Sequence, residues 1–229
     1  MTYLAFVSLI LNIDTAVQTA SVCLSENDKP IAVKVNPSQK DHASWLQPAI
    51  KEIIDEQSLK ISYLDAISIS EGPGSYTGLR VGMASAKGLC FALGIPLITI
   101  NTLQMMAVAA LNEPTTFLCP MIDARRMEVF TALFNKNLEQ QPGPVNVILD
   151  ETFLQDVLSS NTITFFGNGS EKWKGMVKSN NACFKHIEAT AEHMAGLSYI
   201  RLKARQFADL AYAEPFYGKD FHSTVKQST

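Results

Sequence analysis

The chain has 229 residues, 47% of them hydrophobic, which is enough apolar side chain to fill a substantial core. Its formal net charge of -3 gives no broad basic field, which argues against tight binding to nucleic acid by this chain alone. Cys23, Cys90, Cys119 and Cys183 are far apart and include no CxxC pair, so the sequence gives no support for a thiolate metal site and favours buried, reduced thiols.

The apolar start of the chain, YLAFVSLILNI, does not have the features of a secretory signal. It lacks a Lys/Arg-rich first region and runs directly into Asp14 without a convincing cleavage pattern. No other segment is long enough to span a bilayer. We therefore expect a cytoplasmic protein with no membrane contact, in which roughly the first seven residues form a loose extension.

Three short strands open the predicted fold. Residues 9–13, 19–24 and 30–35 are rich in apolar and β-branched side chains, and the third run alternates apolar with polar positions. The links AVQT and SENDK are short enough for hairpins, which join antiparallel strands. The sequence therefore predicts an antiparallel meander.

A helix, a strand, a second helix and a further strand follow. Apolar residues recur at helical spacing over residues 46–57, with Pro48 near the helix start or at a kink. The apolar run 64–69 is predicted to be a strand, residues 77–93 a helix, and the run 95–100 a strand.

The second half is predicted to repeat the order of the first. Strands are expected at residues 117–122, 127–134, 145–149 and 163–166, with a helix over residues 151–158. Both halves place an aspartate after an isoleucine at the end of their first strand, in NIDTAVQTASV and MIDARRMEVFTA. This similarity predicts two duplicated half-domains.

The remaining segments carry weaker signals. Residues 139–144 are typical of a loop, and residues 190–213 of one or two further helices. The polar tail from Gly218 is expected to fray.

The stretch SEGPGSYTGLRVG does not match the common phosphate-binding loops. Gly72 and Gly78 are separated by five residues and no lysine follows, where a Walker loop needs four residues and then Lys. The glycines form GxGxxxG, not the dinucleotide fingerprint GxGxxG. What remains is a strand-to-helix turn with free N–H groups, for which Asp14, Gly72 and Gly74 are a weak candidate site for an anion or nucleotide.

The helix expected over residues 77–93 has two uncharged stripes. The core stripe comprises Leu79, Met83, Ala86, Cys90 and Leu93. Beside it runs a stripe formed by Gly78, Gly82, Ser85 and Leu89. Two glycines in a helix interior cost about 1 kcal/mol each relative to alanine, so a close contact is expected to offset them. Because Arg80 and Lys87 are its only charged residues, we expect this helix to pack on the sheet and, through the small stripe, on a second polypeptide; the alternative neighbour is the helix at residues 46–57.

These segments resemble the bacterial TsaB family, also called YeaZ. The resemblance is carried in order by IDTAVQTASVCL, SEGPGSYTGLRVGMASAKGLCFALGIPLITINTL, IDARRMEVFTALF and AEPFY, from Leu11 or thereabouts to Tyr217. The GPGSYTGLRVG block is highly specific for this family and its catalytic relatives, whereas the other pieces are weaker alone.

The resemblance implies an actin-like (ASKHA) α/β fold of two ribonuclease H-like halves, each a mixed β-sheet flanked by helices. Residues 1–105 are expected to form the N-terminal half, with the partner-binding helices, and residues 106–229 the C-terminal half. The implied function is that of a non-catalytic subunit that binds and stabilises a TsaD-type catalytic subunit, which transfers a threonylcarbamoyl group to the adenosine next to the anticodon of tRNA. A TsaE-type ATPase joins the assembly, a homodimer is expected in isolation, and tRNA is met only through the complex.

The resemblance places the partner contact on the first two helices, here residues 42–57 and 77–93. The candidate partner-binding residues are Gly78, Gly82, Ser85, Leu89, His42 and Trp45. TsaD-type relatives hold a metal with a histidine pair on the first helix, whereas Leu46 stands four residues after His42 here. We therefore expect no metal, no cofactor and no catalytic residue, and treat His42 as an exposed or capping histidine.

Asp14 and Asp123 stand where actin-like ATPases place carboxylates near magnesium and phosphate. The sequences that follow them, TAVQTA and ARRMEV, do not supply a glycine-rich phosphate cradle, so a turn or cap is favoured at both. No serine has a GxSxG context, which leaves a hydrolase unsupported. The alternative function is an ATP-binding kinase or ATPase of the same fold.

Overall fold

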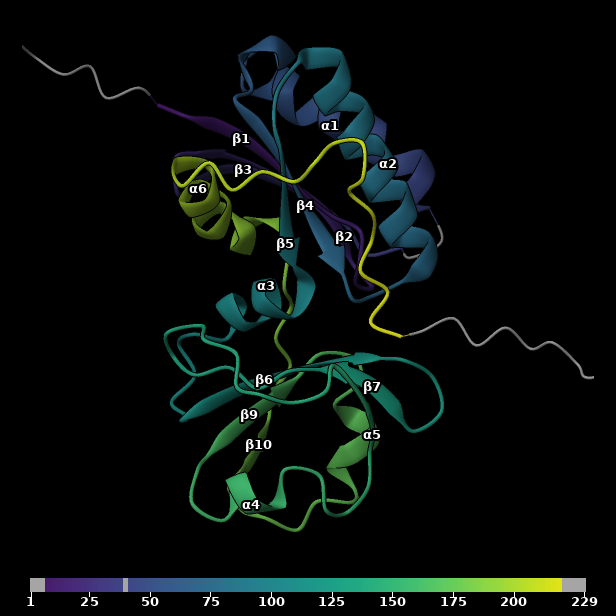
Figure 1. Cartoon of the computed structure of the whole chain (residues 1–229), viewed down its shortest axis with the longest axis vertical. Coiled ribbons are helices and arrows are strands. Elements are labelled where there is room, and N and C mark those ends of the chain that lie inside the picture. Colours follow the sequence, from purple (N-terminus) through teal and green to yellow (C-terminus); the bar gives the residue numbers. More distant parts are fainter. Residues whose placement is uncertain (1–6, 39–40, 220–229) are drawn as a thin grey trace, which may run out of the picture.

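The computed structural model describes residues 7–38 and 41–219, which form two halves with a five-stranded sheet in each (Figure 1). The strands of the first sheet are β1 Leu9–Asp14, β2 Ala20–Glu26, β3 Lys29–Asn36, β4 Ala66–Gly72 and β5 Leu97–Asn101. Their order is β3-β2-β1-β4-β5, with β3, β2 and β1 antiparallel and β1, β4 and β5 parallel. The antiparallel meander expected from the short links is confirmed.

The second sheet repeats this arrangement. Its strands are β6 Phe117–Asp123, β7 Glu128–Thr131, β8 Asn146–Ile148, β9 Ile163–Phe166 and β10 Ala182–Phe184. The order β10-β9-β6-β7-β8 again joins an antiparallel meander to two parallel strands. The two halves are thus duplicated α/β units of the actin-like, ribonuclease H-like kind, as the sequence predicts.

Helices α1, His42–Glu56, and α2, Tyr76–Leu93, lie on one face of the first sheet (Figure 1). Both bury an apolar stripe in the core formed with β1, β2 and β4. The start of α2 is fixed by Ser75, whose side chain accepts from the Gly78 N–H, and its end by Gly94 in the left-handed conformation, with φ of +66°.

The opposite face of the first sheet packs against α3, Thr102–Ala109, and α6, Ala195–Lys203. Helix α3 also contacts β6 and lies between the two halves (Figure 1). The sequence did not predict α3, because its residues TLQMMAVA are apolar almost all round and show no helical period. Since α6 packs on β1 and β5, the chain returns to the first sheet near its end; the division after residue 105 stays a prediction.

The second half contains less helix than the sequence predicted. The helix expected over residues 151–158 is reduced to α4, Gln155–Leu158, and the short α5, Glu171–Lys174, was not foreseen. The segment 190–213 forms a 3-10 turn and α6, and after Lys203 it contains no helix. Helix α6 thus confirms one helix within residues 190–213, whereas the helix over residues 151–158 was predicted too long because local apolar spacing does not distinguish a short buried turn from a longer helix.

Three cysteines are buried and none of the four is paired. Burial raises the pKa of Cys23 and Cys119 to about 12, so both thiols stay protonated, as the sequence suggested. Among the described residues no helix has the length and apolar character to cross a membrane. The expected N-terminal extension and most of the frayed tail fall on residues 1–6 and 220–229, outside the described residues.

Candidate functional site

The glycine turn between β4 and α2 is packed against the chain itself. Gly72 has φ of +121°, and a methyl group here would overlap the carbonyl oxygen of Phe216. The Gly72 N–H donates to Thr102 Oγ1 at 3.1 Å, and the Phe216 N–H donates to the Glu71 carbonyl oxygen at 2.7 Å. The space beside Gly72 is therefore filled by the C-terminal segment.

Gly74 makes a second close approach, to the loop between β1 and β2. A methyl group at Gly74 would overlap the carbonyl oxygen of Ala16, and the Ser75 N–H donates to that same oxygen at 2.7 Å. The N–H groups of Gly72 and Ser75, which a phosphate cradle would use, are thus engaged inside the chain. Both glycines serve close packing in this structure, and the anion site suggested for Gly72 and Gly74 stays a prediction.

Asp14, the third residue of that candidate site, is fully buried at the end of β1. Its Oδ1 accepts from the Ala16 N–H at 3.0 Å and from Ser70 Oγ at 2.5 Å, while Oδ2 has no partner among the described residues. Burial raises the pKa of Asp14 to about 6, although the two hydrogen bonds oppose the rise. Asp14 closes a turn, as the sequence favoured, and its carboxylate points into protein.

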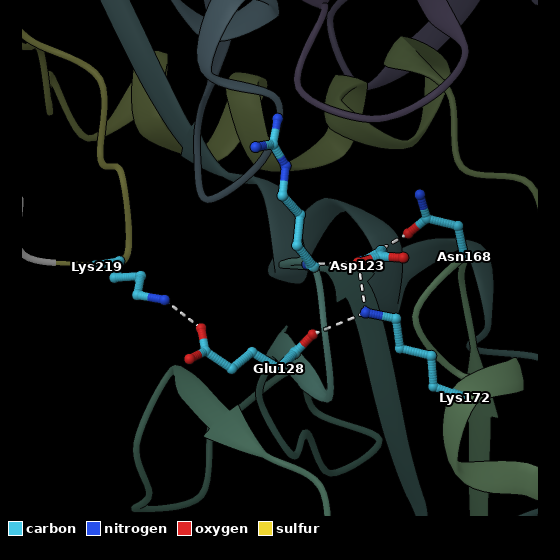
Figure 2. A network of polar contacts seen from close by, with 6 residues as sticks. Asp123, Glu128, Asn168, Lys172 and Lys219 are labelled. Atoms are coloured by element: carbon cyan, nitrogen blue, oxygen red, sulfur yellow. Dashed lines mark hydrogen bonds and ion pairs between the residues drawn. The ribbon is translucent and has the colours of Figure 1, made fainter.

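Asp123 closes the matching turn in the second half, at the end of β6. Its Oδ1 accepts from the Arg125 N–H at 2.6 Å and from Lys172 Nζ at 2.5 Å, and its own N–H donates to Asn168 Oδ1 at 2.9 Å (Figure 2). Partial burial works against ionisation, but the hydrogen bonds from Lys172 and Arg125 outweigh it and lower the pKa of Asp123. This carboxylate is held by the second half alone.

Glu128 completes the polar network around Asp123. Lys172 Nζ donates to its backbone oxygen at 3.2 Å, and its carboxylate pairs with Lys219 (Figure 2). Within the described residues, the ion-pair partner of Glu128 is therefore Lys219, near the end of the described chain.

A cavity of about 810 Å³ lies between the two aspartate turns. The first half lines it with residues 16–18 and 74–77, and the second with residues 122–125 and Asn168. Asp14 does not line this cavity. In the described part of the chain, no three His, Cys, Asp or Glu side chains come close enough to share a metal ion.

His42 is turned into the protein, contrary to the exposed position that the sequence suggested. Only 5% of the residue is accessible, and its Nε2 has no hydrogen-bond partner among the described residues. Burial lowers the pKa of His42, while a hydrogen bond with the Gln18 backbone raises it, so the ring is neutral at pH 7. His42 is therefore not part of the exposed surface of α1, and Trp45, on the same helix, is half-buried against the core; a role for either in partner binding stays a prediction.

The two glycines of the predicted partner stripe on α2 also face inward. Methyl groups at Gly78 and Gly82 would overlap the backbone oxygen and the hydroxyl of Thr15, and the Thr15 hydroxyl donates to the Gly78 carbonyl oxygen at 2.7 Å. The close contacts of the two glycines are thus made within the chain, with Thr15 of the β1–β2 loop and, at Gly82, also with Ile69 of β4, and not with α1. Of the same stripe, Ser85 is half-buried, and Leu89 lines a groove of about 400 Å³ beside α1.

The surface that α2 does leave exposed lies next to that stripe. We call it the α2 face; its residues are Thr77, Arg80, Ala84, Gly88, Phe91 and Ala92. Phe91 is 83% accessible, and nothing lies within 4 Å of a methyl group built on Gly88. Helix α2 contains no Asp or Glu. The sequence of α2 contains two adjacent stripes with small side chains at four-residue spacing. This pattern alone does not indicate which of the two stripes is buried by the rest of the chain.

One flank of α2 is covered by an extended segment, residues 204–217, which we call the strap (Figure 1). The strap pairs with the edge of the first sheet where the Ala208 N–H donates to the Leu97 carbonyl oxygen at 2.9 Å. Lys87 Nζ donates to the carbonyl oxygens of Ala211 and Ala213 at 3.3 and 2.8 Å. Lys87 is therefore used inside the chain, and Arg80 is the cation that α2 presents outward.

Known proteins of related sequence cover nearly the whole chain. A family model described as "TsaD: tRNA N6-adenosine threonylcarbamoyltransferase" matches residues 34–195. A protein of Bacillus subtilis named "tRNA threonylcarbamoyladenosine biosynthesis protein TsaB" is 29% identical over 91% of this chain and 93% of its own. The Escherichia coli protein of the same name is 27% identical over the same shares.

A solved structure described as "YeaZ from Pseudomonas aeruginosa" has the same fold. It superposes with a TM-score of 0.78 at 22% identity and covers 92% of this chain and 99% of its own. At this identity the likeness bears on the fold and not on the site.

Proposed function

The chain belongs to the bacterial TsaB (YeaZ) family, and we propose that it acts in tRNA threonylcarbamoyladenosine biosynthesis as a non-catalytic subunit that binds and stabilises a TsaD-type catalytic subunit. The partner meets the α2 face. In isolation the same face joins two copies of this chain. A TsaE-type ATPase joins the assembled pair, and tRNA is contacted through the complex.

The observation that carries the proposal is the exposed, almost uncharged side of α2. A long helix of a monomeric domain normally presents charged side chains to water, whereas this one exposes Ala84, Gly88 and Ala92 beside the open ring of Phe91. Small side chains at four-residue spacing let a second helix approach closely, and a neighbouring aromatic ring supplies buried apolar area. A related α/β subunit with its own helix pair is the partner that such a surface fits.

The two aspartate turns support the proposal that this subunit has no catalytic activity of its own. Asp14 is sealed by Ser70 and the Ala16 backbone, and Asp123 is neutralised by Lys172. The space beside the glycines of the β4–α2 turn is occupied by Ala16 and by the strap. None of these carboxylates is placed to bind a magnesium–phosphate group without rearrangement.

The test compares one substitution on two helices. Ala84→Arg introduces a long cation at the centre of the α2 face, and Ala204→Arg makes the same change at the exposed end of α6, on the other side of the sheet. We expect Ala84→Arg to weaken binding to the TsaD-type protein of the same organism at least 100-fold by calorimetry, because a charge is forced into a close helix contact. Ala204→Arg is expected to bind like wild type. Wild-type protein that does not bind the TsaD-type protein would refute the proposal.

The second candidate function is an ATP-binding kinase or ATPase of the same fold, which the cavity of about 810 Å³ between the halves favours by its size. Calorimetry with MgATP on the isolated chain distinguishes the two functions, with Asp123→Asn, a change in the lining of that cavity, as control. Micromolar binding that Asp123→Asn abolishes would replace the subunit proposal by the enzyme.

A further inference from the structure

Arg80, the one charged residue of the α2 face, is held in place by two aromatic rings from different elements. Its guanidinium carbon lies 4.4 Å from the ring centre of Tyr76 on α2, and its Nε donates to the Tyr217 hydroxyl at 3.2 Å. The two rings are themselves packed, with centroids 5.1 Å apart and planes inclined by 34°. Because Tyr217 ends the strap, the strap orients a side chain of α2.

The second observation concerns the two terminal nitrogens of the Arg80 guanidinium. Within residues 7–38 and 41–219, neither terminal nitrogen of Arg80 has a hydrogen-bond acceptor or a carboxylate partner. The side chain is exposed, and α2 brings no Asp or Glu of its own. The guanidinium thus presents two adjacent N–H donors outward, in the fork geometry that matches both oxygens of a carboxylate.

Fixing a guanidinium before binding removes most of the entropy that an arginine otherwise loses on forming an ion pair. Arginine and tyrosine are also the residues most often found to dominate binding energy at interfaces. We propose that Arg80, oriented by Tyr76 and Tyr217, is a preformed anchor for a carboxylate of the TsaD-type partner. The inference rests on the proposed function and adds the chemistry by which the α2 face selects its partner.

The same geometry disfavours a second copy of this chain. In a two-fold pair each α2 face meets an identical face, so Arg80 meets a helix that carries cations and no carboxylate. The acids of the neighbouring helix α1 are already paired: Glu52 and Glu56 with Lys34, and Asp55 with Lys51. A foreign subunit with an acidic side chain opposite Arg80 therefore gains an interaction that the homodimer does not have.

The experiment measures heterodimer affinity with the TsaD-type protein, and homodimer affinity of the isolated chain, for wild type, Arg80→Gln, Arg80→Lys and Lys203→Gln. Lys203 lies over the Tyr199 ring on α6 and is a matched loss of a cation above an aromatic ring, away from the α2 face. We expect Arg80→Gln to weaken the heterodimer about 30-fold or more and to leave the homodimer unchanged or tighter. Arg80→Lys should recover only part of the loss, because an ammonium cannot make the paired contact.

The salt dependence of heterodimer affinity distinguishes the loss of an ion pair from the loss of packing, because salt screens only the ion pair. The wild-type heterodimer is expected to weaken more steeply between 50 and 300 mM NaCl than the Arg80→Gln heterodimer, while Lys203→Gln follows wild type. Wild-type binding that Arg80→Gln changes less than about threefold, or equal weakening of heterodimer and homodimer, would overturn the anchor and leave the subunit proposal standing. If Ala84→Arg and wild type bind the TsaD-type protein equally, the contact does not use the α2 face and the anchor fails with it, whereas absence of wild-type binding refutes the subunit proposal itself.

Discussion

Asp14 in the first half and Asp123 in the second end the first strand of their sheets, and each accepts the N–H of the residue two positions later. Their surroundings are opposite. Ser70 and the β1–β2 loop bury Asp14 completely and its pKa rises to about 6, whereas Asp123 stays partly exposed beside Lys172 and its pKa falls. The two halves share the backbone turn at the end of their first strand. The residues that cover each turn determine whether the pKa of its aspartate is raised or lowered.

The largest expected effect concerns the buried turn. Because the pKa of Asp14 is about 6 in the folded protein and 3.8 in the reference state, the native protein binds this proton more tightly than the unfolded chain. Its contribution to stability is complete below pH 3.8 and is lost as the pH rises through 6, by about 3 kcal/mol. Asp14→Asn, which cannot ionise, is expected to remove this fall. Urea unfolding from pH 4 to 7.5 measures it, and an equal pH slope in wild type and variant would contradict the burial argument.

The second prediction concerns how the same turn is packed against α2. Gly78→Ala places a methyl group on the Thr15 backbone, which cannot move without displacing the β1–β2 loop, and should destabilise the fold by about 2 kcal/mol. Gly169→Ala is the matched change at the Asp123 turn. Unlike at Gly78, where it would overlap the Thr15 oxygen, the added methyl group here would lie 2.9 Å from a Val129 methyl group and 3.0 and 3.1 Å from backbone atoms of Ile122 and Asp123. We expect a loss of about 1 kcal/mol or less there. Equal losses in thermal unfolding would show that the two turns are equally tightly packed.

Much of the fold was predictable because strand periodicity and short links are local signals. The meander at the start, β4 and α2 all lie where the sequence placed them, and the repeat of Ile-Asp at the end of β1 and β6 predicted the duplication. Helix α3 was missed because it is buried between two sheets and has no polar side from which to read a period. Residues 204–213 of the strap fall within the segment predicted to be helical, because their contact with Leu97 at the sheet edge is distant in sequence and leaves no local signal.

The sequence indicated that α2 has an almost uncharged side, but not which of its residues are exposed there. The absence of acidic residues from α2 was a valid indication of an uncharged surface. Thr15 decides which stripe of α2 is buried, because it packs on Gly78 and Gly82 and leaves the neighbouring stripe with Ala84 and Gly88 exposed. Thr15 lies some 60 residues earlier in the chain, so the spacing of residues within α2 does not indicate this contact. Tyr217 is a further long-range contributor, since its contact with Arg80 spans 137 positions.

The smallest effect is expected at the exposed turn. The lowered pKa of Asp123 means that its contribution to stability is present above the unfolded pKa of 3.8 and is lost as the pH falls through the lower folded value. Since the Asp123 side chain is 39% accessible, solvent screens the ion pair, and Lys172→Met should cost about 1 kcal/mol or less at pH 7. Lys174→Met, on the same short helix but in a looser pair with Glu171, should cost still less. Urea unfolding at pH 7 and pH 2.5 tests this: the Lys172→Met deficit should become smaller at the lower pH, because protonation of Asp123 removes its charge from the pair. A deficit that persists there in full would assign the role of Lys172 to the packing of its aliphatic stem and would remove the electrostatic contrast between the two turns.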